Sequence, residues 1–253
     1  MLATLFRRRP ARPTRVPPGV RVYAIGDIHG CAGTLAALHA MIAADVADLP
    51  PAEAVLVYLG DYIDRGDDSR GVIEALIGPP PIAARRHLLR GNHEAMLLRF
   101  LDGDLAAGPP WFDYGGAATL LSYRVPVEGP VSREATLAAL REALAARLPA
   151  SHLAFLRGLE TMVRIGDYVF VHAGVRPRIA LDDQSADDLL WIRGAFLGSK
   201  ADHGAVVVHG HSITPEVATR PNRIGIDTGA FATGVLTALV LEGEGRRLLQ
   251  TRP

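Results

Sequence analysis

One stretch decides the fold: Val55-Leu56-Val57-Tyr58-Leu59-Gly60-Asp61-Tyr62-Ile63-Asp64-Arg65-Gly66. Its first five residues are apolar and mostly favour β-structure, which predicts a buried strand. Gly60 ends this strand, and the loop that follows carries two carboxylates and a guanidinium within five positions. Open α/β sheets bind their ligands at the carboxyl ends of strands, so Asp61 is expected to lie in a binding site. A buried strand that ends in charged residues also indicates a charged ligand.

The whole chain has 253 residues, of which 49% are hydrophobic, and a formal net charge of zero. This length allows one large domain with a proper core, or at most two domains. A neutral balance provides no overall field for nucleic acid or for an anionic membrane, and we expect neither partner. The single cysteine, Cys31, excludes an intramolecular disulfide and favours a reducing, cytoplasmic location. No apolar run of about 18 residues is present, so no membrane span is expected.

The N-terminal residues differ in composition from the rest of the chain. Residues 1–21 carry six arginines, four prolines and no acidic residue, and they lack the apolar core of a secretory signal. We interpret residues 1–19 as a disordered basic tail, with a docking or localising segment as the alternative. Residues 20–253 are then expected to form a single catalytic domain, with a helical or loop insertion at about 105–159.

The first hundred residues of this domain repeat one pattern, a strand, a polar loop and a helix. Strands are predicted at 20–25, 54–59 and 86–90, and helices at 33–47, at 72–77 and from 92 to about 101. Such repeated units imply right-handed crossovers and an α/β sheet.

The remaining residues are predicted to contain a loop-rich middle and a second group of strands. Residues 108–125 are predicted to be loop-rich, and 132–159 to be two helices separated near Pro149. A hairpin is expected at 161–165 and 168–171, across Gly166-Asp167, followed by a strand at 205–208. Segments 223–226, 235–241 and 246–250 are expected to form an antiparallel closing set.

Five predicted strand ends carry side chains that can bind metal: Asp27, His29, Asp61, Asn92, His172 and His211. This mixture of oxygen and nitrogen ligands without thiolate suits Mn²⁺, Fe or Zn²⁺, and the imidazoles argue against Mg²⁺ or Ca²⁺ alone. Six ligands exceed what one catalytic metal with open positions needs. If Asp61 is shared, Asp27 and His29 complete one site, and the other three complete a second. Two bridged ions can acidify a water into a hydroxide nucleophile.

A second set of residues suits an anionic substrate. Arg65, Arg90 and Arg193 offer fork-shaped donors for phosphate oxygens, although Arg65 and Arg90 could instead pair structurally with Asp64 or Glu94. His93 and Asp64 are interpreted as a general acid and the carboxylate that orients it.

Other residues of these loops keep two interpretations each. Asn92 could cap a helix as well as bind metal. Cys31 is interpreted as a packing residue, with a redox role as the alternative. His209 is expected in the core or behind the ligands. Trp111, Tyr114 and Tyr123 could line a substrate groove or fill the core.

The ordered motifs resemble those of the calcineurin-like metallophosphoesterases. They are Gly26-Asp27-Ile28-His29-Gly30, Gly60-Asp61-Tyr62-Ile63-Asp64-Arg65-Gly66, Gly91-Asn92-His93-Glu94, His172-Ala173-Gly174 and Gly210-His211. The resemblance is closest to the bacterial and phage branch of the PPP-type serine/threonine protein phosphatases. It implies an α/β fold, an αββα sandwich of two mixed β-sheets flanked by helices. It also implies direct in-line attack by a metal-bridging hydroxide, without a phosphoenzyme.

Residue by residue, the resemblance assigns the same roles. It places Asp27, His29, Asp61, Asn92, His172 and His211 on ligand positions of a dinuclear centre. It places His93 on the general acid, Asp64 on its partner, and Arg65, Arg90 and Arg193 on phosphate-binding positions. Position 213 is Ile where many other metallophosphoesterases carry a second histidine, which agrees with the protein phosphatase branch.

These observations predict a phosphomonoesterase that acts on phosphoserine or phosphothreonine in a protein or peptide. Its cofactors would be two divalent ions, with manganese favoured over iron or zinc. The first alternative is a symmetric dinucleoside tetraphosphate hydrolase. In that group a small residue usually replaces Asp64 and Asp follows the Asn-His pair, so Asp64 and Glu94 favour the protein phosphatase. The second alternative is a scaffold without activity, which should have lost a ligand or the acid.

Overall fold

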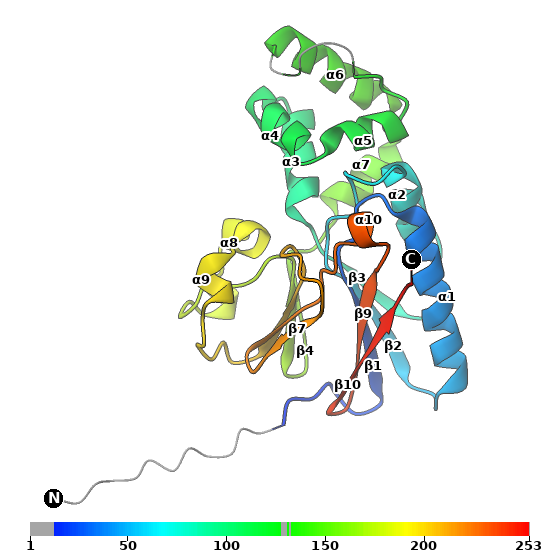
Figure 1. Cartoon of the computed structure of the whole chain (residues 1–253), viewed down its shortest axis with the longest axis vertical. Coiled ribbons are helices and arrows are strands. Elements are labelled where there is room, and N and C mark those ends of the chain that lie inside the picture. The colour runs from blue at the N-terminus through cyan, green and yellow to red at the C-terminus, as the bar shows by residue number, and fades with distance from the viewer. Residues whose placement is uncertain (1–12, 128–130, 132, 253) are drawn as a thin grey trace, which may run out of the picture.

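The computed structural model describes residues 13–127, 131 and 133–252. Two β-sheets of five strands each form the centre, and helices flank them (Figure 1). The strand order is β10-β9-β1-β2-β3 in the first sheet and β4-β5-β6-β8-β7 in the second. Both sheets mix parallel and antiparallel pairs, so the predicted αββα sandwich is confirmed.

The first sheet contains the predicted strand–loop–helix units. Strands β1 (Val20–Ile25), β2 (Glu53–Tyr58) and β3 (Arg85–Leu88) run parallel, and β9 (Thr237–Glu242) and β10 (Gly245–Gln250) are antiparallel to their neighbours. Helices α1 (Ala32–Asp48) and α2 (Ser69–Ile77) cover its outer face (Figure 1). Side chains alternate along β1: Tyr23 and Ile25 pack toward the helices, whereas Val22 and Ala24 join the layer between the sheets.

The second sheet is built from shorter strands. They are β4 (Met162–Ile165), β5 (Tyr168–Val171), β6 (Val206–His209), β7 (Ala218–Arg220) and β8 (Arg223–Gly225). Helices α8 (Ala186–Trp191) and α9 (Gly194–Leu197) lie on its outer side, where Leu189 and Phe196 are buried against Val169 and Val171. On its inner face, Phe170 and Val208 meet Val55 and Val57 of the first sheet in one apolar cluster.

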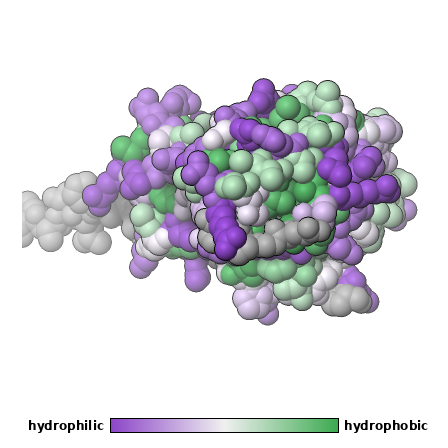
Figure 2. Space-filling model, turned by 90° about the horizontal axis from the view of Figure 1, so that it is seen from above, coloured by the Kyte–Doolittle hydropathy of each residue, from purple (hydrophilic) through white to green (hydrophobic). Residues whose placement is uncertain are grey.

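Most of the remaining helices gather at one end of the sandwich (Figure 1). They are α3 (Asn92–Leu101), α4 (Gly108–Asp113), α5 (Gly116–Ser122), α6 (Glu134–Arg147) and α7 (Ala150–Arg157), with 3₁₀ turns at Leu105–Ala107 and Leu181–Asp183 and a short α10 (Ala230–Thr233) elsewhere. From above, hydrophilic and hydrophobic residues share this end, with hydrophobic ones gathered near its middle (Figure 2). Within the described ranges, no helix is long and apolar enough to span a bilayer.

The prediction of a loop-rich segment at 108–125 is wrong, because α4 and α5 occupy most of it. Pro109 and Pro110 lie in the first turn of α4, where a missing N–H costs nothing. Gly115 has φ 105° and joins the two helices in the left-handed region. The predicted pair of helices around Pro149 is confirmed as α6 and α7.

The predicted closing set is only partly correct. β9 and β10 pair antiparallel in the first sheet as expected, but β8 belongs to the second sheet, where it runs parallel to β6. It pairs antiparallel with β7, a three-residue strand too short to recognise from its sequence.

The packed chain also begins earlier than the predicted boundary at Val20. Residues 1–12 of the predicted tail lie outside the described residues. Val16, in contrast, is buried, and its N–H donates to the Gly243 carbonyl at 3.1 Å. Part of the segment assigned to the tail therefore contributes to the apolar layer between the sheets.

Candidate active site

The loops after five strands converge at one edge of the sandwich. Asp27 follows β1, Asp61 follows β2, Asn92 begins α3 after β3, His172 follows β5 and His211 follows β6. All five side chains are buried, and a hollow of about 300 Å³ opens beside them. Nine residues line it: His29, Asp61, Arg65, Asn92, His93, Tyr114, Trp191, Arg193 and His211. The structure thus brings residues as far as 184 positions apart in sequence to one site, as the sequence predicted.

Backbone strain is concentrated in these loops. His29, Asp61, Asp64, Arg65 and His211 have φ values of 48°, 51°, 72°, 68° and 62°, in the left-handed region that non-glycine residues seldom adopt. Such conformations cost free energy and persist where the surrounding structure imposes them, most often at functional sites.

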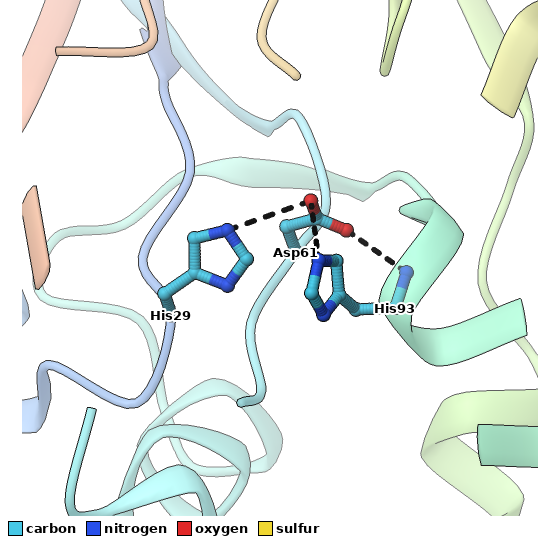
Figure 3. Close-up of side chains that lie close together, drawn as sticks. All are labelled: His29, Asp61 and His93. Carbon is cyan, nitrogen blue, oxygen red and sulfur yellow. Dashed lines mark hydrogen bonds and ion pairs between the residues drawn. The ribbon is translucent and has the colours of Figure 1, made fainter. Parts of the chain in front are cut away.

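The first triad consists of His29, Asp61 and His93, whose ligand atoms lie within 4.8 Å of one another (Figure 3). The Asp61 Oδ2 atom lies 3.6 Å from His29 Nε2 and 3.8 Å from His93 Nε2. The other carboxylate oxygen of Asp61 accepts the His93 backbone N–H at 3.1 Å.

The second triad consists of Asp61, His172 and His211, again with ligand atoms within 4.8 Å. The His172 Nε2 atom lies 3.4 Å from Asp61 Oδ2 and 2.9 Å from Asn92 Oδ1. Asp61 therefore belongs to both triads, which is the geometry expected of a bridging carboxylate.

Backbone carbonyls orient two of the imidazoles. His29 Nδ1 donates to the Ile63 carbonyl at 2.8 Å, and His172 Nδ1 donates to the Leu59 carbonyl at 2.9 Å. Nδ1 thus carries a proton in each ring, which leaves Nε2 as the nitrogen that faces Asp61. Histidines that bind metal are held in this way in proteins. Burial opposes the charged form of His172, but Asp61 raises its pKa to about 9, so its Nε2 also holds a proton that a bound metal ion would displace.

Two buried polar atoms of the site are suited to bind cations. Asp27 Oδ1 and His211 Nε2 are buried and have no hydrogen-bond partner among the described residues. Buried polar atoms are rarely left unpaired, and a carboxylate with an imidazole is a common donor set for Mn²⁺, Fe or Zn²⁺. Gly210 keeps this position open, since a Cβ there would lie 1.9 Å from Asp27 Oδ1. The residues present therefore fit the two ions that the sequence predicted.

The electrostatics agree with a site built for cations. Burial and then the charge of Asp227 raise the pKa of Asp27 well above its usual value. Burial opposes ionisation of Asp61 too, but His172 and His93 hold its pKa well below the usual value. Burial lowers the pKa of His29 to about 3 and that of His211 to about 2, so both rings are neutral ligands at pH 7. Several carboxylates thus share a space in which ionisation costs free energy without a cation.

The predicted acid and its partner are in direct contact. His93 Nδ1 donates to Asp64 Oδ2 at 2.6 Å. Asp64 is fully buried, and it also accepts bonds from Trp111 Nε1 at 2.8 Å and Thr119 Oγ1 at 2.6 Å. Burial lowers the proton affinity of His93, but Asp61 and Asp64 outweigh it, and the pKa of His93 is raised. Helices α4 and α5 therefore support the pair through Trp111 and Thr119.

The arginines separate into two groups. Arg65 and Arg193 line the hollow, and Arg65 Nη2 lies 3.4 Å from His93 Nε2. Arg90 instead lines a neighbouring hollow, where it donates to the Arg157 carbonyl at 3.0 Å; Trp191 lies between the two hollows and lines both. Among the described residues, neither Arg65 nor Arg90 forms a salt bridge, which removes the alternative of structural ion pairs.

Two residues of the site have roles that the sequence did not reveal. The Glu94 carboxylate accepts the backbone N–H groups of Asp61 at 3.0 Å, Tyr62 at 2.8 Å and Gly91 at 2.9 Å, so it holds two metal loops together. Asp227, buried after β8, accepts the Gly229 N–H at 3.0 Å and raises the pKa of Asp27. Asp227 could have been found from its position after the predicted strand at 223–226. That strand was instead grouped with the closing antiparallel strands, whereas it belongs to the second sheet.

The residues with two interpretations are now placed. Trp111 and Tyr123 are buried in the core, and only Tyr114 borders the hollow. Cys31 is half-buried and its thiol pKa is raised by burial, as befits a packing residue. His209 is buried behind the site and bonds to the Gly210 carbonyl at 3.0 Å. Asn92 is the first residue of α3.

Comparison with known proteins identifies one family, and relatives of this chain carry two different activities in their names. The calcineurin-like phosphoesterase family matches residues 20–233. The serine/threonine-protein phosphatase 2 of Salmonella typhimurium is 29% identical over 225 residues, which cover 85% of this chain and 90% of that protein. The symmetrical bis(5'-nucleosyl)-tetraphosphatase of Methylococcus capsulatus is 30% identical over 156 residues, 62% of this chain and 44% of that protein.

The fold has matching neighbours among solved structures. A protein provisionally described as a diadenosine tetraphosphatase superposes with a TM-score of 0.61 at 22% identity, covering 94% of this chain and 98% of its own. The family match covers every predicted metal ligand and every strand of the two sheets except β9 and β10. The chain belongs to the calcineurin-like phosphoesterase family.

Proposed function

We propose that this protein is a metal-dependent phosphoserine/phosphothreonine protein phosphatase. The family depends on a pair of metal ions, and the two triads that share Asp61 are suited to hold them. The observation that carries the proposal is the contact between His93 and Asp64 beside the shared Asp61, since ester cleavage would need an acid next to the two proposed ions.

The ligands would divide between two ions as the resemblance to the metallophosphoesterases implies. Asp27 and His29 would hold one ion, Asn92, His172 and His211 the other, and Asp61 would bind both. When bound, the pair supplies Lewis acidity and lowers the pKa of a water to near neutrality. The proposed metal is manganese, with iron and zinc as alternatives that the same ligand set accepts. The proposed location is the cytoplasm, and the single cysteine, Cys31, supports it.

His93 would protonate the leaving oxygen of the ester. Its Nδ1 is held by Asp64, which fixes the ring and favours the charged form that can donate a proton. The ring lines the hollow, where a leaving group would lie. Because the Nε2 atom also belongs to the first triad, a role of His93 as a metal ligand is the competing assignment.

Arg65 and Arg193 would hold the phosphoryl oxygens. Both line the hollow, and their guanidinium groups form planar forks that match phosphate geometry. Arg90 lines the adjoining hollow, so it would reach the phosphate only after releasing the Arg157 carbonyl.

A second candidate is a symmetric dinucleoside tetraphosphate hydrolase, because a relative with that name is 30% identical over 62% of this chain. Asp64 and Glu94 weigh against it. Both are fully buried and tied into the site by several hydrogen bonds, as expected if they are part of the working centre.

Comparative turnover on metal-analysed protein tests this proposal. The protein is stripped, reloaded with Mn²⁺, Fe²⁺ or Zn²⁺, and assayed on a phosphothreonine peptide, diadenosine tetraphosphate and p-nitrophenyl phosphate. We expect the peptide to have a higher kcat/KM than the dinucleotide. Faster cleavage of the dinucleotide would reverse the order of the two candidates, and no turnover with any metal would point to an inactive scaffold.

A further inference from the structure

Exposed aromatic side chains occur around the hollow. The large hydrophobic side chains that are exposed among the described residues include three aromatic ones: Tyr114 at 48%, Trp191 at 37% and Phe231 at 38%. They come from three separate parts of the chain, the end of α4, the end of α8 and the short α10. All three nevertheless lie against residues of one site.

Each ring packs against a different histidine of that site. The Phe231 ring meets His29 edge to face with 5.5 Å between centroids, and it lies 4.7 Å from Arg65 Cζ. Tyr114 meets His93 at 6.2 Å, and Trp191 meets His211 at 6.3 Å. Tyr114 and Trp191 line the hollow directly, and Phe231 adjoins it through His29 and Arg65.

Apolar rings that stay exposed at a polar site need an explanation. Exposed apolar surface is unfavourable in water, and where it gathers on a folded protein it usually marks a place of binding. Phosphate alone does not need such surface, because the arginines and metal ions held at the triads would satisfy its oxygens. The rings therefore point to the part of the substrate that is attached to the phosphate.

We propose that Tyr114, Trp191 and Phe231 form an aromatic subsite that binds a flat aromatic group joined to the phosphate. The inference goes beyond the proposed function, because phosphoserine and phosphothreonine carry no ring. It rests on that function in one respect, that the phosphate lies at Arg65 and the triads. Two sources carry this chemistry: the ring of a phosphorylated tyrosine, and the base of a nucleoside polyphosphate. Aromatic rings prefer offset-stacked or edge-to-face contacts with centroids about 4.5–7 Å apart, and rings that border the phosphate site can reach such distances from either group.

Equilibrium binding tests the subsite without relying on turnover. Phenylphosphonate and methylphosphonate present the same phosphorus group, with and without a ring, and a phosphatase cannot hydrolyse their carbon–phosphorus bond. Calorimetry on the metal-loaded protein should show tighter binding of phenylphosphonate. In Phe231→Leu and Trp191→Leu, which keep apolar bulk but remove the ring, this advantage should shrink several-fold, by about tenfold at most for each ring.

A matched control removes exposed apolar surface elsewhere. Leu248 is 42% exposed on β10 and takes no part in the hollow, so Leu248→Ala should leave both affinities as they are. An equal loss for both phosphonates in Phe231→Leu would show that the ring acts by supporting Arg65, and it would overturn the subsite. An equal affinity of the two phosphonates in the unchanged protein would overturn it too.

Turnover then separates the two sources of the ring. Peptides of one sequence carrying phosphotyrosine or phosphothreonine are compared, as are diadenosine tetraphosphate and inorganic tripolyphosphate. An aryl oxygen is the better leaving group, so phosphotyrosine could be cleaved faster without any subsite. The measure is therefore the ratio of kcat/KM within each pair of substrates, compared between the unchanged protein and Trp191→Leu. A fall confined to phosphotyrosine identifies an aryl ester, and a fall confined to the dinucleotide identifies a base. Failure to cleave phosphothreonine would count against the proposed function alone, since the phosphonate result stands without it.

Discussion

The two triads share Asp61 but are assembled in different ways. The first comes entirely from the loops of the first sheet, within residues 29–93, whereas the second adds His172 and His211 from the other sheet. The loops of the first triad bond directly to each other, for example from the His29 N–H to the Asp61 carbonyl at 2.8 Å.

The second triad depends on contacts between the sheets. Three hydrogen bonds of 2.9 Å link its histidines to the loops of the first sheet: His172 Nδ1 to the Leu59 carbonyl, His172 Nε2 to Asn92 Oδ1, and the His211 N–H to Asp27 Oδ2. Behind them lies the apolar layer of Val57, Phe170 and Val208. One triad is thus a local structure, and the other exists only where the two sheets are packed together.

Replacing the shared ligand should have the largest effect. Asp61→Asn keeps the size of the side chain but removes the charge from both triads, so both ions should be lost or loosely held. Since metal ions contribute several kcal/mol to such reactions, we expect kcat/KM to fall about 1,000-fold or more. Elemental analysis should show fewer than two ions per chain. A variant that retains both ions and its activity would mean that Asp61 is not the bridge.

His93 distinguishes an acid from a ligand within the first triad. His93→Asn should lower kcat by about 100- to 10,000-fold, the usual range for a general acid, with both ions still bound. In the kcat–pH profile, the fall at high pH, where His93 loses its proton, should disappear. The fall at low pH should remain. Loss of one ion from this variant would instead make His93 a ligand of the first triad.

The two arginines of the hollow belong to different sheets: Arg65 lies in the loop after β2 of the first sheet, and Arg193 lies between α8 and α9, which pack on the second sheet. Arg65→Ala and Arg193→Ala should each lower kcat/KM by up to about 100-fold, because each removes a donor to the charged phosphoryl group. Arg65 lies in the strained loop of the first triad and should have the larger effect. Arg90→Ala serves as the reference, and a loss as large as that of Arg65→Ala would show that Arg90 moves into the site when substrate binds.

The apolar layers offer a direct test of how the triads are assembled. Val208→Ala leaves a cavity between the sheets, and Leu38→Ala leaves one between α1 and the first sheet. Each should destabilise the protein by about 1–4 kcal/mol. Metal titrations should show weaker binding at one of the two sites in Val208→Ala only. Equal metal affinities in the two variants would mean that the second triad does not depend on the packing of the sheets.

The smallest effect concerns pH and lies outside the triads. Burial, followed by the charge of Arg86, lowers the pKa of His39 from 6.5 to about 4 in the folded protein. The unfolded chain therefore binds the extra proton first, and His39 should reduce the stability as the pH falls from about 6.5 toward 4. His39→Gln can still bond to the Tyr58 hydroxyl, 2.9 Å from His39 Nε2. Denaturant titrations of this variant should show a shallower loss of stability in that window, and an unchanged slope would exclude His39.

The metal ligands were predictable because of where they lie in sequence. Each follows a predicted strand, and all but His172 stand directly beside a glycine, so sequence order and the rule of strand ends were enough to group them. The support for the acid was not predictable. Trp111 and Thr119 lie in a segment that contains Gly108-Pro109-Pro110 and Gly115-Gly116, and glycine and proline are typical of loops. Only tertiary packing makes this segment helical.

The pairing of short strands was the other limit. β8 has three residues, and nothing in its sequence distinguishes a parallel neighbour such as β6 from an antiparallel one such as β9. Because of that error the sequence analysis missed Asp227 and Phe231, which follow β8 and reach the site from the second sheet. Residues whose place depends on sheet order are therefore the ones that the sequence alone leaves out.

Gly210 has a consequence of its own. The missing side chain at this position leaves room for Asp27 Oδ1, which a Cβ would meet at 1.9 Å. A single methyl group here would clash with the Asp27 carboxylate and force it to move, although every ligand residue would still be present in the sequence. A survey of relatives by ligand identity alone would count such a protein as intact, so the absence of an atom at residue 210 is as informative about activity as the histidine that follows it.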